Sequence, residues 1–173
     1  MNNPNLWTEA WNAPWIAGGL TLQASTLDAF KHHAEQAYPS EGCGLLSGPA
    51  DAPLMVDGCE IVENLADRYH ALDPETFPRT SRTYFKMHEL RTQRALELGL
   101  RQGRPVKVIA HSHCDSGAYF SAEDAATFAQ EGRLMWPCAF LVTSVMAGRA
   151  ADSRLWVYNA ESNAFDEAEY SLV

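Results

Sequence analysis

Two histidines near the middle of the chain have the spacing of a metal-binding pair. His111 and His113 follow the apolar segment 105–110 (PVKVIA), which is typical of a short buried strand. Side chains two positions apart on a strand point to the same face. Two imidazoles on one face can bind a single zinc ion at about 2.0–2.1 Å. The pair therefore predicts a metal site where this strand ends.

A serine and an aspartate extend the pattern. Ser121 and Asp124 follow the histidines in the arrangement H-x-H-x7-S-x2-D. The intervening turn, 114–119, can return the chain to the metal, so that the first turn of a helix beginning at Ser121 presents Asp124. We predict that His111, His113 and Asp124 bind one Zn2+ per chain. Two histidines and one aspartate leave a fourth tetrahedral position for water, which indicates a catalytic site.

A catalytic zinc site also needs a group that moves protons. Zinc lowers the pKa of its bound water towards about 7, and a nearby carboxylate then takes the water proton and passes it to the leaving nitrogen. Our candidate is Glu41 in the segment EGCGLLSG, where Gly42 and Gly44 would let the backbone approach the site. Ser121 is the candidate hydrogen-bond donor to the oxyanion.

Each of these features also has an ordinary structural explanation. Ser121 with Asp124 is the sequence of a helix N-cap followed by an acid at the third helical position. An isolated His-x-His pair on a strand more often serves packing, and Glu41 alone would be an unremarkable surface acid. Ligand type, spacing and expected local structure agree here, and their agreement favours the metal site.

Helical and strand patterns are interspersed along the chain, which predicts a mixed α/β fold in layers. The continuous apolar run 138–146 indicates a central buried strand. Further strands are expected at 19–23, 41–48, 59–64, 83–87, 105–110 and 153–160, with a final strand or hairpin edge over 161–172. Helices are expected from an N-cap at Ser25 or Thr26 to Pro39, over 88–103 and over 121–132, with an irregular loop at 66–83.

The N-terminal part of the chain has a composition of its own. We predict an N-terminal arm over 1–18 and one domain over 19–173. Trp7, Trp11 and Trp15 lie four residues apart, as in a short helix that packs one aromatic face on the domain. The prolines and asparagines of this arm are equally consistent with an irregular segment. A partner-binding arm and a homodimer stay open.

Composition narrows the function classes. The chain has 173 residues, enough for one domain with a core, and its net charge of -9 argues against a nucleic-acid partner. A small basic patch facing a protein partner is compatible with this charge. No apolar segment reaches the roughly 18 residues of a membrane span, and the first residues do not resemble a signal peptide. We therefore expect no membrane partner and a cytoplasmic location, where the four cysteines are thiols.

Taken together, these residues identify a family. The sequence resembles the JAMM, or MPN+, metallopeptidases over roughly 19–160, through an upstream Glu41, the motif from His111 to Asp124 and the lead-in YPSEGCGLLSG. The resemblance implies a mixed sheet flanked by helices, similar to cytidine deaminases, with one zinc. It also implies His111, His113 and Asp124 as ligands, Glu41 as acid/base and Ser121 as oxyanion donor.

The resemblance also implies a substrate class. Members of the family cleave peptide or isopeptide bonds at the C-terminal tail of ubiquitin-like proteins. The small size and the segment GAYFSAED look most like the small bacterial branch, which acts on ThiS- or MoaD-like sulfur-carrier proteins or releases cysteine from such a carrier. We expect a peptidase or isopeptidase acting at a Gly-Gly tail of such a partner.

Three rival functions stay open. DNA-repair-linked proteins of the RadC type carry a similar motif, but the acidity of this chain disfavours them. A non-catalytic MPN-type scaffold typically lacks the ligands, whereas this chain has them. A metal-dependent amidase acting on a small molecule is also consistent with the residues.

Three further features have two interpretations each. Cys114 replaces the proline that many members have after the second histidine; it is either filler, pointing away from the His113 face, or a redox-sensitive thiol. Asp115 is either a turn residue or a partner of the site. Asn64 either binds its own loop or supports a substrate groove, over which residues 66–86 could form a flap.

Overall fold

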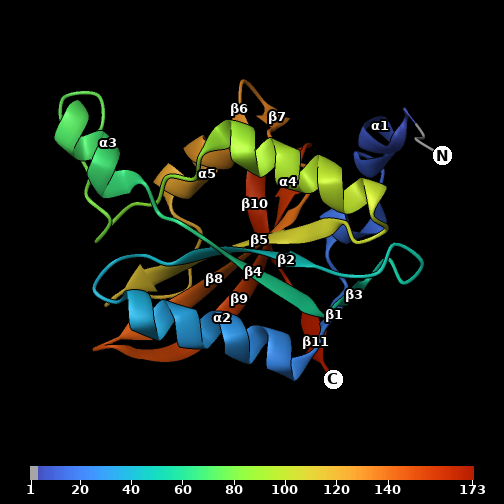
Figure 1. Cartoon of the computed structure of the whole chain (residues 1–173), viewed down its shortest axis with the longest axis horizontal. Coiled ribbons are helices and arrows are strands. Elements are labelled where there is room, and N and C mark those ends of the chain that lie inside the picture. Colours follow the sequence, from blue (N-terminus) through green and yellow to red (C-terminus); the bar gives the residue numbers. More distant parts are fainter. Residues whose placement is uncertain (1–3) are drawn as a thin grey trace.

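The computed structural model describes residues 4–173, which form a central sheet between helices (Figure 1). Within these residues the sheet has six strands in the order β10-β9-β8-β5-β2-β4. β5 and β8 are parallel, and the other neighbouring pairs are antiparallel. The strands are β2 (Cys43–Ser47), β4 (Gly58–Val62), β5 (Val106–Cys114), β8 (Ala139–Met146), β9 (Arg149–Asn159) and β10 (Ala164–Ala168).

Helices cover both faces of this sheet (Figure 1). α2 (Ala24–Ala37) lies on one face, and α4 (Glu89–Arg101) and α5 (Ala122–Phe128) lie on the other. α1 (Leu6–Ala10) packs against α4, and α3 (Ala66–Leu72) lies at the outer side of the molecule. This arrangement confirms the predicted layered α/β class.

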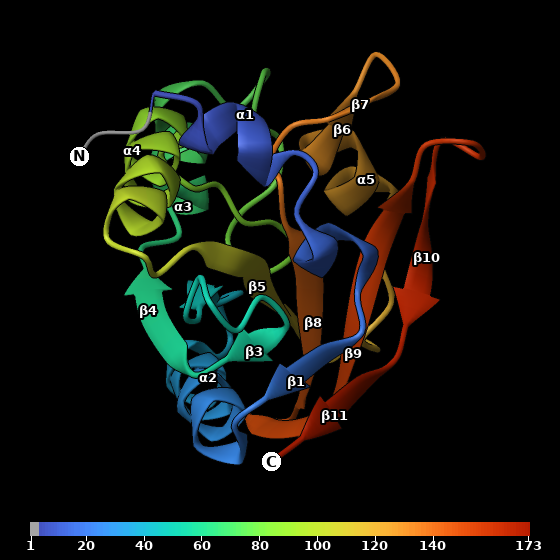
Figure 2. The same ribbon diagram turned by 90° about the vertical axis from the view of Figure 1, so that its right-hand side faces the viewer.

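The other strands of residues 4–173 form a three-stranded sheet and a short hairpin. β1 (Leu20–Leu22) lies between β3 (Met55–Val56) and β11 (Tyr170–Leu172), and all three are parallel (Figure 2). β6 (Ala129–Gln130) and β7 (Arg133–Leu134) form a short antiparallel hairpin after α5. Among the helices of residues 4–173, none combines the length and apolar character needed to cross a bilayer.

The central strand β5 is buried along almost its whole length and carries both histidines of the motif. Every residue from Val106 to His113 is buried, because β2 and β8 pair with β5 on its two edges and helices cover its faces. Ala110 packs in the apolar cluster on the α2 side, whereas Ile109 packs in the cluster on the α4 side. The alternation places His111 and His113 on the Ile109 face, as the sequence predicts.

Two predictions in the segment before α4 are wrong. The expected loop 66–83 contains α3, which begins where the side-chain Oδ1 of Asn64 accepts the N–H of Ala66. The expected strand 83–87 is extended but pairs with no strand. Its residue Lys86 instead donates its N–H to the Asn64 side chain and accepts a hydrogen bond from Leu65.

Three boundaries also differ from the prediction. The helix expected over 121–132 ends at Phe128, because the chain turns back at Glu131 and Gly132, whose φ values of 50° and 73° suit a tight hairpin. β5 runs on to Cys114, so the histidines lie on the strand rather than beyond it. α2 begins after Gln23, without a capping side chain from the expected serine or threonine.

The tryptophans of the N-terminal segment do not share one face. Trp15 lies in a short 3-10 helix (Pro14–Ala17), is 7% exposed and donates from Nε1 to the carbonyl of Pro137 at 2.8 Å. Trp7 meets Trp11 edge to face, and Trp11 is 37% exposed. The part of the arm over residues 1–3 lies outside the described residues, and the arm's boundary stays a prediction.

A buried lysine fixes the loop between β2 and β3. Lys107 on β5 is fully buried, and its Nζ donates to the carbonyls of Pro49, Ala52 and Met55 at 2.7–2.8 Å. Its ammonium also lies 5.8 Å from the Trp15 ring centroid. One side chain therefore satisfies three carbonyls of this loop.

We expect Lys107→Met to lower the free energy of unfolding by about 2–4 kcal/mol, because three carbonyls lose a charged donor while the apolar stem is kept. Urea denaturation measures the change. Lys31→Met, at a partly exposed lysine of α2, is the control and should cost well under about 1 kcal/mol. Equal effects of the two substitutions would contradict this role of Lys107.

Candidate metal centre

Three donor atoms from β5 and α5 converge on one point. His111 Nε2 lies 3.2 Å from His113 Nε2 and 3.1 Å from Asp124 Oδ1, and His113 Nε2 lies 3.2 Å from Asp124 Oδ2. All three side chains are buried. Within residues 4–173 they are the one group of three or more such side chains whose ligand atoms gather closely enough for a metal ion.

The spacing of these donors suits a small divalent cation. Ligands about 2.0–2.1 Å from a tetrahedral centre lie about 3.3 Å from one another, close to the separations seen here. The three atoms present lone pairs to one another, which is unfavourable unless a proton or a cation lies between them. The donor set of two imidazoles and one carboxylate therefore fits a metal that leaves one position open.

The ring of His111 is enclosed by apolar side chains. Phe85 stacks on it with ring centroids 4.3 Å apart and planes inclined by 22°. Its Nδ1 is buried and has no hydrogen-bond partner among residues 4–173. The ring therefore has polar neighbours only at Nε2, on the side of His113 and Asp124.

The orientation of His113 is set by a backbone carbonyl. Its Nδ1 lies 2.8 Å from the carbonyl oxygen of Gly117, so this nitrogen carries the proton and Nε2 is left as the ligand atom. Burial lowers the pKa of His113, but the hydrogen bond and charge of Asp124 and the charge of Glu41 outweigh it, so that the pKa is raised overall. Without a metal, a proton on His113 thus pairs with Asp124.

Asp124 is held by the start of α5. Its Oδ2 accepts the N–H of Ser121 at 2.9 Å, while its own N–H donates to Ser121 Oγ at 3.0 Å. This capping box confirms the ordinary interpretation of the pair and still directs the carboxylate at both imidazoles. Burial opposes ionisation of Asp124, yet the charges and hydrogen bonds of His111 and His113 hold its pKa well below the usual range.

Glu41 lies next to this group, immediately before β2. Its side chain is buried, and burial raises the pKa of Glu41 to about 8, with His113 opposing the shift and Asp124 adding to it. Its backbone is fixed on both sides, since its N–H donates to the Ser81 carbonyl and its carbonyl accepts from the Asn64 side chain. Glu41 therefore titrates near neutrality, where an acid/base group works best.

The two glycines after Glu41 have a different purpose from the one expected. A Cβ at Gly42 would lie 3.1 Å from the His33 ring on α2, and one at Gly44 would lie 3.0 Å from the Glu60 carbonyl. Both glycines therefore make room for packing on the α2 side, and the prediction that they admit the backbone to the site is wrong.

Asn64 connects Glu41 to the segment before α4. Its Nδ2 donates to the carbonyls of Glu41 and Tyr84, and its Oδ1 accepts the N–H groups of Ala66 and Lys86, all at 2.9–3.0 Å. One side chain thus uses its hydrogen-bonding capacity to hold three segments together, its own loop among them, and its support of a substrate groove stays a prediction.

One hollow borders the donor group through His113, and a larger hollow shares Glu123 with it. The larger has a volume of about 350 Å³ and lies between residues 84–87, the start of α4, α5 and the hairpin after it. The smaller has a volume of about 140 Å³ and is lined by Glu41, Arg79, Arg82, Thr83, His113, Cys114, Ser116, Tyr119, Ser121 and Glu123.

Comparison with known proteins places the chain. The family described as Prokaryotic homologs of the JAB domain matches residues 23–158, most of the chain. The chain belongs to this family. No curated protein matches the sequence.

Solved structures share the JAB fold at low sequence identity. A protein of Desulfitobacterium hafniense, DSY2949, is 24% identical with a TM-score of 0.65, and one of Salinibacter ruber is 23% identical with a TM-score of 0.59. Each match covers 89% of this chain and 92% of the other. AF2198, a JAB1/MPN domain protein of Archaeoglobus fulgidus, is 18% identical with a TM-score of 0.51 and coverages of 89% and 99%.

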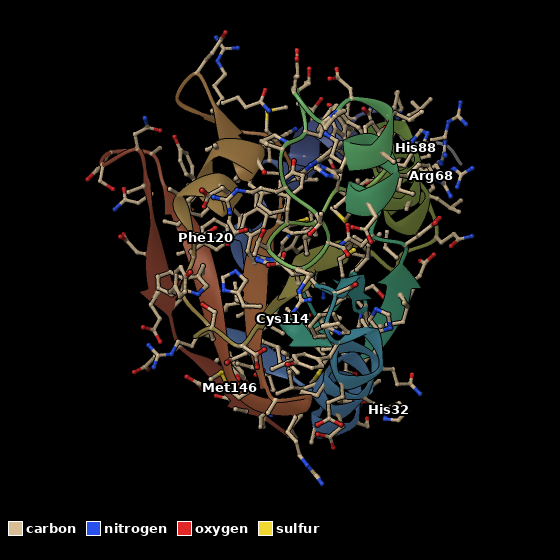
Figure 3. All side chains as sticks on the ribbon, turned by 90° about the vertical axis from the view of Figure 1, so that its left-hand side faces the viewer. His32, Arg68, His88, Cys114, Phe120 and Met146 are labelled. Carbon is tan, nitrogen blue, oxygen red and sulfur yellow. The ribbon has the colours of Figure 1, made fainter. Side chains whose placement is uncertain are left out.

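The residues after the second histidine of this JAB domain form a turn. Asp115 has a φ of 54°, and its carboxylate accepts from the Tyr38 hydroxyl at 2.6 Å and the Ala147 N–H at 2.7 Å. Cys114 lies at the wall of the smaller hollow, near the middle of the face in Figure 3, and burial raises the pKa of its thiol to about 11. A thiol that is protonated at neutral pH is a poor target for oxidation, which favours the filler interpretation.

Several neighbours of the site gave no signal in the sequence. Phe85 stacks on His111 from a segment expected to be a strand, and Gly117 contributes only its carbonyl. Arg79 forms an ion pair with Glu123 at 2.6 Å across the site's rim. These contacts join residues far apart in the chain or involve backbone atoms, so no local spacing reveals them.

Metal affinity should rise with pH. Because the pKa of His113 is raised above its ordinary value, a proton occupies the site in mildly acidic solution and must leave before a metal binds. We expect the zinc affinity, measured by competition with a chelating dye, to increase from about pH 5.5 to 7.5. Asp124→Asn should lose zinc binding and with it the increase of affinity with pH. A zinc affinity of the wild type that does not depend on pH would contradict the assignment of His113 as a ligand.

Removal of the Asn64 side chain should loosen the frame around Glu41. We expect Asn64→Ala to reduce the free energy of unfolding by about 2–4 kcal/mol, because four backbone groups lose their partner. Metal stoichiometry should be unchanged, since the three donors come from other elements. Thermal unfolding of this variant against Asn12→Ala, at an exposed asparagine, makes the comparison; similar melting temperatures would refute the role.

Proposed function

We propose that this JAB domain is a zinc-dependent peptidase or isopeptidase that hydrolyses a bond at the C-terminal Gly-Gly tail of a ubiquitin-like or sulfur-carrier protein. The observation that supports it most is the convergence of His111, His113 and Asp124 beside the buried carboxyl group of Glu41. A structural metal site would need no such proton carrier and would be closed by a fourth protein ligand.

The chain's own residues have distinct roles in this proposal. A zinc ion held by His111, His113 and Asp124 would supply an activated water at neutral pH. Glu41 takes a proton and delivers it to the leaving nitrogen, a role that suits a pKa near neutrality. Ser121 accepts the Asp124 N–H at Oγ, so its hydroxyl proton is free to donate to the carbonyl oxygen as that oxygen gains charge.

The two hollows support the substrate class. An extended tail that ends in two glycines suits the larger hollow, because this hollow is lined by the extended segment 84–87 and by α5. The smaller hollow, with Arg82 at its wall beside the Arg79–Glu123 ion pair, has room for a small leaving residue that carries a carboxylate. Such a residue would be present in a carrier conjugated to a single amino acid.

The proposal includes a cytoplasmic location. The four cysteines are free thiols, as in a reducing compartment. A role as a non-catalytic scaffold is disfavoured because the three donors and Glu41 lie together, and an amidase for small molecules is the alternative that the assay below separates.

Glu41→Gln should abolish cleavage and leave the metal in place. We expect wild-type protein and variant to bind about one zinc per chain, and the rate of the variant to fall by about 10²–10⁴, because the amide cannot carry the proton. The substrate is a ubiquitin-like carrier extended by one residue beyond its Gly-Gly end, and intact mass spectrometry follows the product. Glu63→Gln, at an exposed position, is the matched control.

The outcomes separate the alternatives. Cleavage by wild type and control but not by Glu41→Gln supports the proposal. Zinc binding without cleavage of the carrier, but with turnover of small amides, would identify an amidase instead. Absence of stoichiometric zinc would overturn the metal assignment together with the proposed reaction.

A further inference from the structure

The charges of this acidic chain are unevenly distributed. Between Glu75 and Asp115 there are eight Lys and Arg residues but only two acids, Glu89 and Glu97, a net charge of +6. The remainder has five Lys and Arg residues against twenty acids, a net charge of -15. The positive stretch comprises the rim of the site, the floor of the larger hollow, α4 and most of β5.

α4 presents three of these arginines as one exposed stripe. At about 100° per residue, Leu90, Arg91, Arg94, Leu98 and Arg101 fall within roughly 100° of the helix circumference. Glu97, whose carboxylate accepts a hydrogen bond from Gln93, lies at the edge of this stripe. All five residues of the stripe are exposed, and the two leucines are 51% and 48% exposed. The opposite side of the helix, with Thr92 and Leu96, packs on the sheet.

The arginines of the stripe are available to a partner. Within residues 4–173, no carboxylate forms an ion pair with Arg91, Arg94 or Arg101. By contrast Arg104, just after the helix, is paired with Asp57. Half-exposed leucines among unpaired arginines are typical of an interface with an apolar centre and a charged rim.

The helix that carries the stripe borders the larger hollow near the site. That hollow is lined by Glu123, which also lines the smaller hollow with Glu41 and His113, and by Glu89 and Thr92 on the first turn of α4, on the side of the helix away from the stripe. In Figure 3, which looks onto Cys114, His88 marks the side of the molecule from which α4 starts. A tail lying in the hollow would therefore bring the body from which it extends towards α4.

We propose that the α4 stripe docks the folded body of the carrier protein through an acidic surface that surrounds apolar side chains. This proposal rests on the proposed function, because it names the partner of the same site. Acidic protein is favoured over nucleic acid, since the two exposed leucines require apolar contacts that a phosphate backbone does not offer.

Charge reversal on α4 tests the docking surface. Arg91→Glu combined with Arg94→Glu should raise KM for an acidic ubiquitin-like carrier with an extended Gly-Gly tail by roughly tenfold or more, with kcat little changed. The free tail peptide should be cleaved as by wild type, because it lacks the docking body. Lys31→Glu combined with Arg149→Glu changes the net charge equally at positions outside the positive stretch and should leave both substrates unaffected.

A binding measurement keeps the docking surface independent of catalysis. Calorimetry of zinc-loaded Glu41→Gln protein with the same carrier should show roughly tenfold weaker binding when the two α4 arginines are reversed, and Leu98→Ser should weaken binding without changing its salt dependence. Tail cleavage without any effect of reversal on carrier binding would overturn the docking surface and leave the proposed function standing. Carrier binding that depends on the stripe, without tail cleavage, would support the docking surface and overturn the proposed function.

Other occupants give different results. Sedimentation that shows self-association of the wild type, lost on charge reversal, would mean that the stripe binds the acidic surface of a second copy, and would overturn the proposal. Binding of a DNA duplex through the same arginines, at a salt concentration where the carrier does not bind, would overturn it as well.

Discussion

Three lone-pair donors face one another in the interior of this JAB domain, and the surrounding fold has to hold them together wherever no proton or cation lies between them. His111 and His113 come from the central strand, whose neighbours β2 and β8 fix its position on both edges. Asp124 comes from the first turn of α5, where the capping box with Ser121 fixes the carboxylate. Because each donor is anchored by its own backbone, the cluster persists without relying on contacts between the donors themselves.

A second group of contacts organises the rim. Asn64 joins the start of α3, the extended segment before α4 and the backbone of Glu41, so that one polar side chain replaces the strand pairing which that segment lacks. Phe85 is thereby pressed against His111. Glu41 and the segment 84–87, which lines the larger hollow, are thus both held by Asn64, so that a displacement of one would displace the other.

The sequence was sufficient for the parts of this molecule that follow a local rule. The side-chain period of a strand places His111 and His113 on one face, and a capping box places Asp124 at a helix start. It was insufficient where long-range contacts decide. The extended segment around Phe85 has the alternation of a strand but bonds to a side chain, and α3 begins at an asparagine bond rather than at a recognisable cap.

The position of β5 has a consequence for motion. Its amides from Val108 to His111 are buried and lie between two paired strands, so we expect them to exchange only through global unfolding. The rim around Arg82 and Thr83 is exposed, and its backbone is held by few bonds. Amide hydrogen exchange would thus have two very different rates within one site. The amides of β5, which hold the metal donors in place, would exchange slowly, and the amides around Arg82 and Thr83 would exchange many times faster.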